Sequence, residues 1–190
     1  SDECLIENSL ARNVINEILD LLNESNIYPY NEETNTGDLR HLVLRTNSKN
    51  EFMLILVIRE NKPKIHKFVS LIKSPLIKSL YLNINPNKTN VILGKEFIHV
   101  FGDEYLEEEL FGNKFNIHPN SFFQVNYAQM KKLYKCAIDL LDAKPTDTVI
   151  DAYSGIGTIT LSIAPHVKKI YGIEVVEEAV VNANENKVRN

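Results

Sequence analysis

Cysteine is scarce in this sequence and tryptophan is absent. The only cysteines among the 190 residues are Cys4 and Cys136. Two thiols cannot build a disulfide framework or a self-contained four-cysteine metal site. The sequence also lacks an apolar run near the ~20 residues that a membrane-spanning helix needs, and it shows no basic-then-apolar leader. These absences predict a cytoplasmic protein that has no membrane partner.

The net charge is −4, which by itself argues mildly against a nucleic-acid partner. The distribution of charge is more informative than its sum, because a local basic strip can contact phosphates even on an acidic protein. The basic residues between positions 59 and 78 stand against a single acid, Glu60. Together with an upstream segment, this strip supplies the candidate phosphate contacts Arg40, Arg45, Lys62, Lys64 and Lys67. The alternative is that the strip is only the solvated face of a helix.

A short apolar strand followed by glycines is the most informative feature of the chain. The strand ends at Asp151, and Gly155 and Gly157 precede an apolar helical pattern. Glycine lets the backbone turn tightly and approach a ligand closely, and the next helix directs its free N–H groups at that ligand. A second strand, at 169–173, is followed by Glu174, at the position where an acidic residue binds the ribose hydroxyls of a nucleotide.

Two cofactors and a purely structural alternative compete for this unit. The dinucleotide fingerprint G-x-G-x-x-G requires a third glycine, but Thr160 occupies that position. An acidic residue that closes the first strand, with glycines four and six residues later, instead resembles the first motif of S-adenosylmethionine-dependent methyltransferases. This order favours S-adenosylmethionine over nicotinamide and over a strand–turn–helix that binds nothing.

The elements predicted along the chain change in character near residue 120. Residues 1–121 combine amphipathic helices with short strands, which indicates an α+β domain with a mostly antiparallel sheet. Residues 122–190 begin a parallel, doubly wound sheet, and Asn126 is the expected cap of its first helix. Two parallel strands cannot bury such a core. We therefore expect a fragment, which a missing C-terminal segment completes or which self-associates through its open sheet.

Particular segments carry a family resemblance that covers nearly the whole chain. Residues 119–126, Pro-Asn-Ser-Phe-Phe-Gln-Val-Asn, and the loop at 151–157 resemble the RNA 5-methyluridine methyltransferases of the RumA/TrmA type. Residues 37–45 resemble the G-x-L-R-H-x-x-x-R segment of that family. The resemblance implies a central, RNA-facing α+β domain followed by the first half of a Rossmann-like, S-adenosylmethionine-dependent methyltransferase domain.

The same resemblance implies the chemistry and the cofactor contacts. In that family a cysteine attacks C6 of a uridine, C5 takes the methyl group, and a glutamate removes the C5 proton. Carried over by position, Gln124, Tyr153 and Glu174 contact S-adenosylmethionine. Gly155 and Gly157 let the backbone approach the methionine part of the cofactor.

The resemblance places the reacting residues outside this sequence. The nucleophilic cysteine and the catalytic glutamate are expected beyond Asn190, and neither Cys4 nor Cys136 stands in such a motif. Cys4 instead resembles the last of four cysteines that hold an iron–sulfur cluster in some members, so no cluster is expected in this chain. No catalytic residue is therefore assigned here, and the chain alone is expected to be inactive.

The sequence thus predicts part of an RNA uracil-C5 methyltransferase whose partner is RNA. Large-subunit (23S) ribosomal RNA is favoured over transfer RNA, because the Cys4 segment and the long central domain resemble the ribosomal group. The alternatives are a transfer RNA enzyme, a non-catalytic RNA-binding module and, more distantly, a nicotinamide-dependent oxidoreductase.

Overall fold

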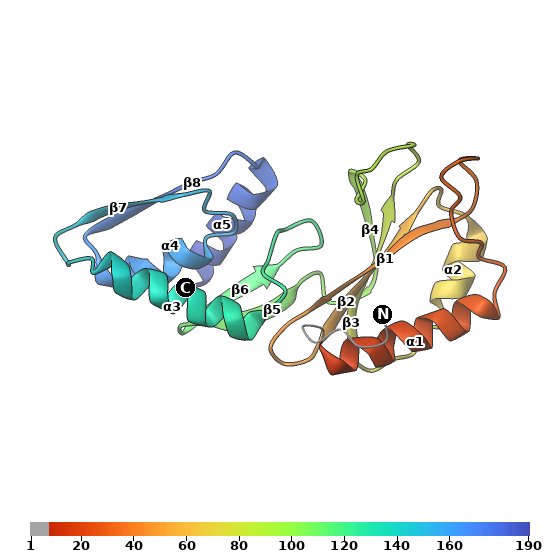
Figure 1. Cartoon of the computed structure of the whole chain (residues 1–190), viewed down its shortest axis with the longest axis horizontal. Coiled ribbons are helices and arrows are strands. Elements are labelled where there is room, and N and C mark those ends of the chain that lie inside the picture. The colour runs from red at the N-terminus through yellow and green to blue at the C-terminus, as the bar shows by residue number, and fades with distance from the viewer. Residues whose placement is uncertain (1–7) are drawn as a thin grey trace. The chain divides into compact units, whose positions relative to one another are not determined.

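The fold is taken from a computed structural model that describes residues 8–190 (Figure 1). Cys4, which the sequence links to a cluster motif, lies outside the described residues. The chain forms two compact units, which divide between Leu106 and Glu107. This division comes before the boundary expected at residue 121. Each unit is described by itself.

The first unit contains a four-stranded sheet with the order β1-β2-β3-β4. Strands β1 and β2 are antiparallel, as are β3 and β4, whereas β2 and β3 run parallel. Two of the three pairings are therefore antiparallel, as the sequence predicts, and the parallel pairing arises because α2 forms a crossover between β2 and β3. The elements are α1 (Ser9–Asn23), β1 (Leu39–Thr46), β2 (Phe52–Ile58), α2 (Pro63–Val69), β3 (Ile77–Ile84) and β4 (Glu96–Gly102).

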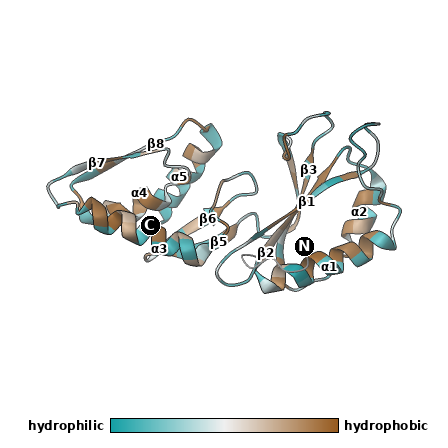
Figure 2. Ribbon diagram, viewed as in Figure 1, coloured by the Kyte–Doolittle hydropathy of each residue, from teal (hydrophilic) through white to brown (hydrophobic). Residues whose placement is uncertain are grey.

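The core of the first unit forms around β2, in which every residue is buried. Alternate β2 side chains such as Leu54 and Leu56 pack with Ile18 of α1 and Phe68 of α2. Both helices carry hydrophobic and hydrophilic residues, as expected for helices that cover one face of a sheet (Figure 2). The side chain of Asn8 caps α1 by accepting a hydrogen bond from the N–H of Leu10 at 2.9 Å.

The second unit combines a hairpin, a pair of parallel strands and helices. Strands β5 and β6 form one two-stranded sheet, and the parallel strands β7 and β8 form another. The expected cap of α3 is confirmed, because the Asn126 side chain accepts a hydrogen bond from the N–H of Gln129 at 3.1 Å. The elements are β5 (Leu106–Leu110), β6 (Asn113–Ile117), α3 (Tyr127–Leu141), β7 (Thr148–Ala152), α4 (Thr158–Ile163), η1 (Ala164–His166), β8 (Lys169–Ile173) and α5 (Glu177–Arg189).

The β5–β6 hairpin belongs to the second unit for a packing reason. Leu110 and Phe115 are fully buried and form one cluster with Met130 of α3 and Ile156 of the glycine loop. The sequence suggested the later boundary because the hairpin continues the run of short strands that precedes it. Its hydrophobic partners come later in the chain and do not appear in a local pattern.

The parallel pair is incompletely covered within the described residues. Ile150 of β7 is 63% exposed and Ile173 of β8 is 54% exposed. Strand β7 pairs with β8 alone in this part of the chain, so its other edge carries no strand. Parallel strands of doubly wound folds are normally buried on both faces. The second unit therefore presents an apolar, open-edged sheet.

Candidate cofactor site

The glycine loop connects β7 to α4 through backbone angles that most residues avoid. Tyr153, Gly155 and Gly157 have φ values of 62°, 55° and 84°. Glycine adopts such angles without steric cost, whereas a residue with a side chain does so at about 1–3 kcal/mol. Tyr153 is also 86% exposed, so its ring is directed to solvent and not into the core. A strained, exposed aromatic residue beside a glycine turn is the kind of feature found at ligand sites.

Glu174 closes this loop from the adjacent strand. One carboxylate oxygen, Oε2, accepts a hydrogen bond from the N–H of Gly155 at 2.9 Å. The other, Oε1, accepts from the N–H groups of Val175 and Val176 at 2.7 and 2.9 Å. Hydrogen bonds from the backbone of Val176, Gly155 and Val175 lower the pKa of Glu174. The structure thus joins the predicted glycine loop directly to the predicted ribose acid.

Thr160, which interrupts the dinucleotide fingerprint, has a defined role in this loop. Its hydroxyl donates a hydrogen bond to Oδ2 of Asp151 at 2.6 Å, so the first turn of α4 is tied to the end of β7. A side chain at Gly172 of β8 would meet Ser154 Oγ at 2.8 Å and Thr160 Oγ1 at 3.2 Å. In the sequence motif Thr160 is only a missing glycine, because its contact with a residue nine positions away is not part of that motif.

A hollow of about 330 Å³ borders the glycine loop on the side of α4, β8 and α5. Ser154, Gly157 and Glu174 contribute to its wall. Polar groups of the loop and apolar groups of the helices therefore meet in one concave surface, which is the usual composition of a small-molecule site.

Gln124 lies in the irregular segment between β6 and α3 and is exposed. In residues 8–190, neither Gln124 nor Tyr153 makes a hydrogen bond to Gly155 or Glu174. The geometry therefore brings together the loop and the ribose acid, and the roles of Gln124 and Tyr153 stay predictions.

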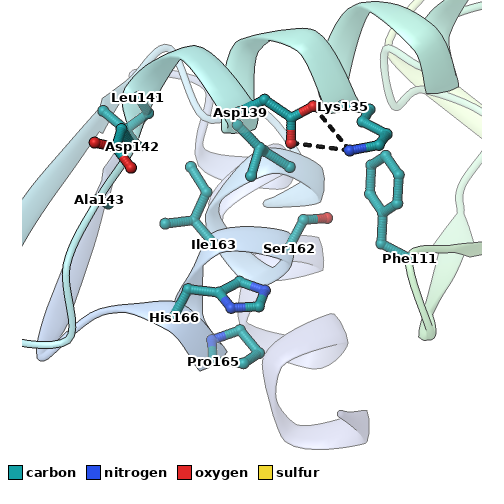
Figure 3. A pocket seen from close by; sticks show the side chains of 11 residues that line it. Phe111, Lys135, Asp139, Leu141, Asp142, Ala143, Ser162, Ile163, Pro165 and His166 are labelled. Carbon is teal, nitrogen blue, oxygen red and sulfur yellow. Dashed lines mark hydrogen bonds and ion pairs between the residues drawn. The ribbon is translucent and has the colours of Figure 1, made fainter.

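A larger cavity of about 540 Å³ lies between α3, α4 and η1, and the sequence did not predict it (Figure 3). Lys135 and Asp139 form an exposed ion pair on its rim, with Nζ and Oδ2 2.8 Å apart. Its other walls come from residues such as Phe111 and His166. No predicted cofactor residue lines this cavity, and none of its described side chains is a buried polar group without a partner.

Arg40 has an internal role in the first unit. Its Nη1 donates hydrogen bonds to the carbonyl oxygens of Asn85 and Asn87 at 3.2 and 2.5 Å. Its Nη2 donates to the carbonyl of Thr89 at 3.2 Å, and the guanidinium lies 4.1 Å from the centre of the Tyr30 ring. Arg40 therefore organises the loop after β3, which does not favour its predicted contact with RNA phosphate.

The lysines of the predicted basic strip divide between internal and exposed positions. Lys64 Nζ lies 2.5 Å from Oδ2 of the buried Asp38, and Lys62 Nζ lies 3.6 Å from Oδ1. Burial raises the pKa of Asp38, but hydrogen bonds from Lys64 and Tyr28 and the charges of both lysines outweigh it, so the pKa is lowered. Lys67 is exposed on α2 and has no ion pair in the described structure. It remains the freest candidate phosphate contact.

Arg45 is half-buried on β1, and burial lowers its pKa. Its Nε is buried without a hydrogen-bond partner. Among residues 8–190, no group of three or more histidine, cysteine or acidic side chains could hold a metal ion, and no helix is long and apolar enough to cross a membrane.

Residues 51–190 match the family described as tRNA (uracil-5-)-methyltransferase. The chain belongs to this family. It is 43% identical over 195 residues to an uncharacterized RNA methyltransferase of Streptococcus agalactiae, covering 100% of this chain and 43% of the relative. An uncharacterized RNA methyltransferase of Fusobacterium nucleatum is 38% identical over 197 residues, which is 100% of this chain and 42% of that protein.

A solved structure extends the comparison to three dimensions. The tRNA (uracil-54, C5)-methyltransferase of Pyrococcus abyssi, in complex with S-adenosyl-L-homocysteine, has a TM-score of 0.79 and 28% identity. The match covers 100% of this chain and 46% of that one. The chain thus spans less than half the length of these relatives. Membership confirms the resemblance drawn from the sequence, the partial Rossmann-like methyltransferase fold and S-adenosylmethionine as the cofactor of the family.

Proposed function

We propose that the whole protein to which this sequence belongs transfers a methyl group from S-adenosylmethionine to C5 of uridine in RNA. The observation that carries this proposal is the direct pairing of Glu174 with the Gly155 N–H at the C-terminal ends of β7 and β8. Ligands of open α/β sheets bind at this edge. Family membership supplies the reaction class.

The residues present suit the adenosine and methionine parts of the cofactor. A carboxylate offers about four acceptor positions, and the Glu174 side chain uses three of them on backbone N–H groups. One position remains for a ribose hydroxyl. At Gly155 no atom lies within 4 Å of the position that a side chain would take, so the methionine part can approach the backbone closely. S-adenosylmethionine, when bound, supplies the methyl group.

The first unit is the proposed RNA-facing part of the chain, and the exposed Lys67 is its most available candidate phosphate contact. Ribosomal RNA stays the favoured substrate, on the strength of the Cys4 segment and the length of the central domain. The name of the Pyrococcus abyssi relative supports the alternative of transfer RNA. An experiment can distinguish these two substrates.

Methyl transfer should require more than these 190 residues. The free cysteine of the described chain, Cys136, is exposed on α3, whereas the paired loop and acid lie at the ends of β7 and β8. With tritiated S-adenosylmethionine, a full-length protein that contains this sequence should label RNA, and nucleoside mass spectrometry should identify 5-methyluridine. The 190-residue chain should give no label above the blank.

Separate reactions with unmodified large-subunit ribosomal RNA and transfer RNA identify the substrate. Label in transfer RNA alone would reverse the preference for ribosomal RNA. RNA binding without any 5-methyluridine from the full-length protein would contradict the enzyme and favour a binding module.

A further inference from the structure

Helix α5 carries an unusual row of asparagines on the face that packs against the rest of the second unit. Asn182 and Asn186 of the helix and Asn190, its C-cap, stand four residues apart, which places them on one side of the helix. Asn182 is 3% exposed and Asn186 is fully buried. The buried stripe of a helix is normally apolar, and a buried polar group persists at low cost only when it is hydrogen-bonded. We therefore expect these buried amides to have hydrogen-bond partners within the protein.

Asn186 has two partners from different parts of the unit. Its Oδ1 accepts a hydrogen bond from the backbone N–H of Asn116 in β6 at 2.8 Å. Its Nδ2 donates to the carbonyl of Ile156, the residue between Gly155 and Gly157, at 3.1 Å. A single side chain thus links the middle of the glycine loop to a strand of the hairpin.

The flanking asparagines extend this link in both directions. Asn190 accepts from the N–H of Lys114 at 2.7 Å and donates to the carbonyl of the same residue at 2.8 Å, as a neighbouring strand would. Asn182 accepts from the hydroxyl of the buried Ser121 at 3.0 Å. Ser121 directly precedes the Phe-Phe-Gln segment that contains Gln124. The helix therefore bonds to the glycine loop and to the residues that directly precede the Gln124 segment.

We propose that Asn186 is a positioning residue of the cofactor site. It holds the glycine loop in register with β6 through the Ile156 carbonyl, while Asn182 anchors the start of the Gln124 segment to the same helix. Removing the Asn186 amide leaves the part-buried N–H of Asn116 and the buried carbonyl of Ile156 without this partner, and the second loss falls on the loop itself. The identity of the ligand as S-adenosylmethionine rests on the proposed function. The role of Asn186 in fixing the loop does not depend on that function.

The first test uses full-length protein and S-adenosylhomocysteine in calorimetric titration. Asn186→Ala should weaken binding about tenfold or more, since an unpaired buried polar group accompanies the lost bonds. Val188→Ala is the matched control, because Val188 is an exposed residue of α5 that does not line the hollow beside the glycine loop. Equal affinity of the two variants, both folded by circular dichroism, would overturn the proposal.

A pH profile of Asn186→Asp separates loop positioning from general structural damage. The ionised carboxylate can accept from the Asn116 N–H but cannot donate to Ile156, whereas the protonated acid can do so. Burial raises the pKa of such a carboxyl. The affinity of this variant relative to wild type should therefore recover as the pH falls from 8 to 5.5. A flat ratio would contradict a role for the donor.

Charged neighbours are common to all variants in that profile. His118 faces Glu185 at 3.1 Å, Arg189 pairs with Glu107, and Lys187 lies on the same helix. Because Asn186→Ala keeps these groups, it provides the reference. Its ratio to wild type should stay flat over the range.

Hydrogen exchange of the ligand-free protein measures how firmly the glycine loop is held when no ligand is bound. Asn186→Ala should accelerate exchange in a peptide covering residues 153–158, and Val188→Ala should not. Failure of wild type to bind S-adenosylhomocysteine would count against the proposed function, while faster exchange would still uphold the positioning role. Unchanged exchange would overturn that role whatever the ligand result.

Discussion

Replacement of Glu174 by alanine is expected to weaken S-adenosylhomocysteine binding about tenfold to a hundredfold in a full-length protein that contains this sequence. The change removes the acceptor for a ribose hydroxyl. It also removes the three backbone hydrogen bonds that hold Gly155 against the start of α5. The loss of loop geometry and the loss of the ligand bond act in the same direction.

Calorimetric titration measures this effect, and Glu177→Ala is the matched control. Glu177 is an exposed acid in the first turn of the same helix, so its removal changes the charge equally without touching the loop. An unchanged dissociation constant for a folded Glu174→Ala protein would mean that Glu174 only caps α5.

The pKa of Glu174 sets the pH range of this contact. Because hydrogen bonds lower the pKa below the ordinary value of 4.5, the group is charged in the folded protein throughout the neutral range. Its stabilising contribution is complete above about 4.5 and is lost as the pH falls through the lower, folded-state pKa. Wild-type affinity should therefore show no dependence on this group between pH 6 and 8.

The isolated 190-residue chain should self-associate through its second unit. The side chains of Leu133, Leu140, Ile150 and Ile173 are between 54% and 80% exposed. The edge of β7 that faces away from β8 has no described strand partner. An exposed apolar edge is a template for pairing with another chain. The effect on apparent mass is large, because a monomer becomes at least a dimer.

Size-exclusion chromatography with light scattering, over a dilution series, tests this association. Ile150→Lys should shift the chain toward monomer, since a charge on an exposed strand opposes pairing. Val188→Lys adds the same charge to an exposed apolar position on α5 and should leave association unchanged. A wild-type chain that stays monomeric at all concentrations would show that the open sheet does not recruit a second copy.

Local features of the second unit could be predicted from the sequence because their physics is local. The glycine spacing requires a tight turn, and the structure places positive φ values at Gly155 and Gly157. The cap at Asn126 depends on a neighbour three residues away. Glu174 was predicted from the end of an apolar strand, and it meets the loop because parallel strands end at one edge.

Features that depend on distant partners could not be predicted in this way. The sequence offers Arg40 only as a candidate phosphate contact, because its carbonyl partners lie more than forty residues later in the chain. From the sequence alone, Asn186 is expected to face solvent with the other polar residues of its helix. Its partners, Asn116 and Ile156, are distant in the sequence. A side chain's charge or polarity does not reveal whether its partner is solvent, backbone or ligand.

The most direct test of the account is a crystal structure of the full-length protein with S-adenosylhomocysteine. The account predicts the ribose within hydrogen-bonding distance of Glu174 and the amino-acid part beside the backbone of Gly155 and Gly157. Binding instead in the cavity lined by Phe111, Lys135 and His166 would contradict the site proposed for this chain.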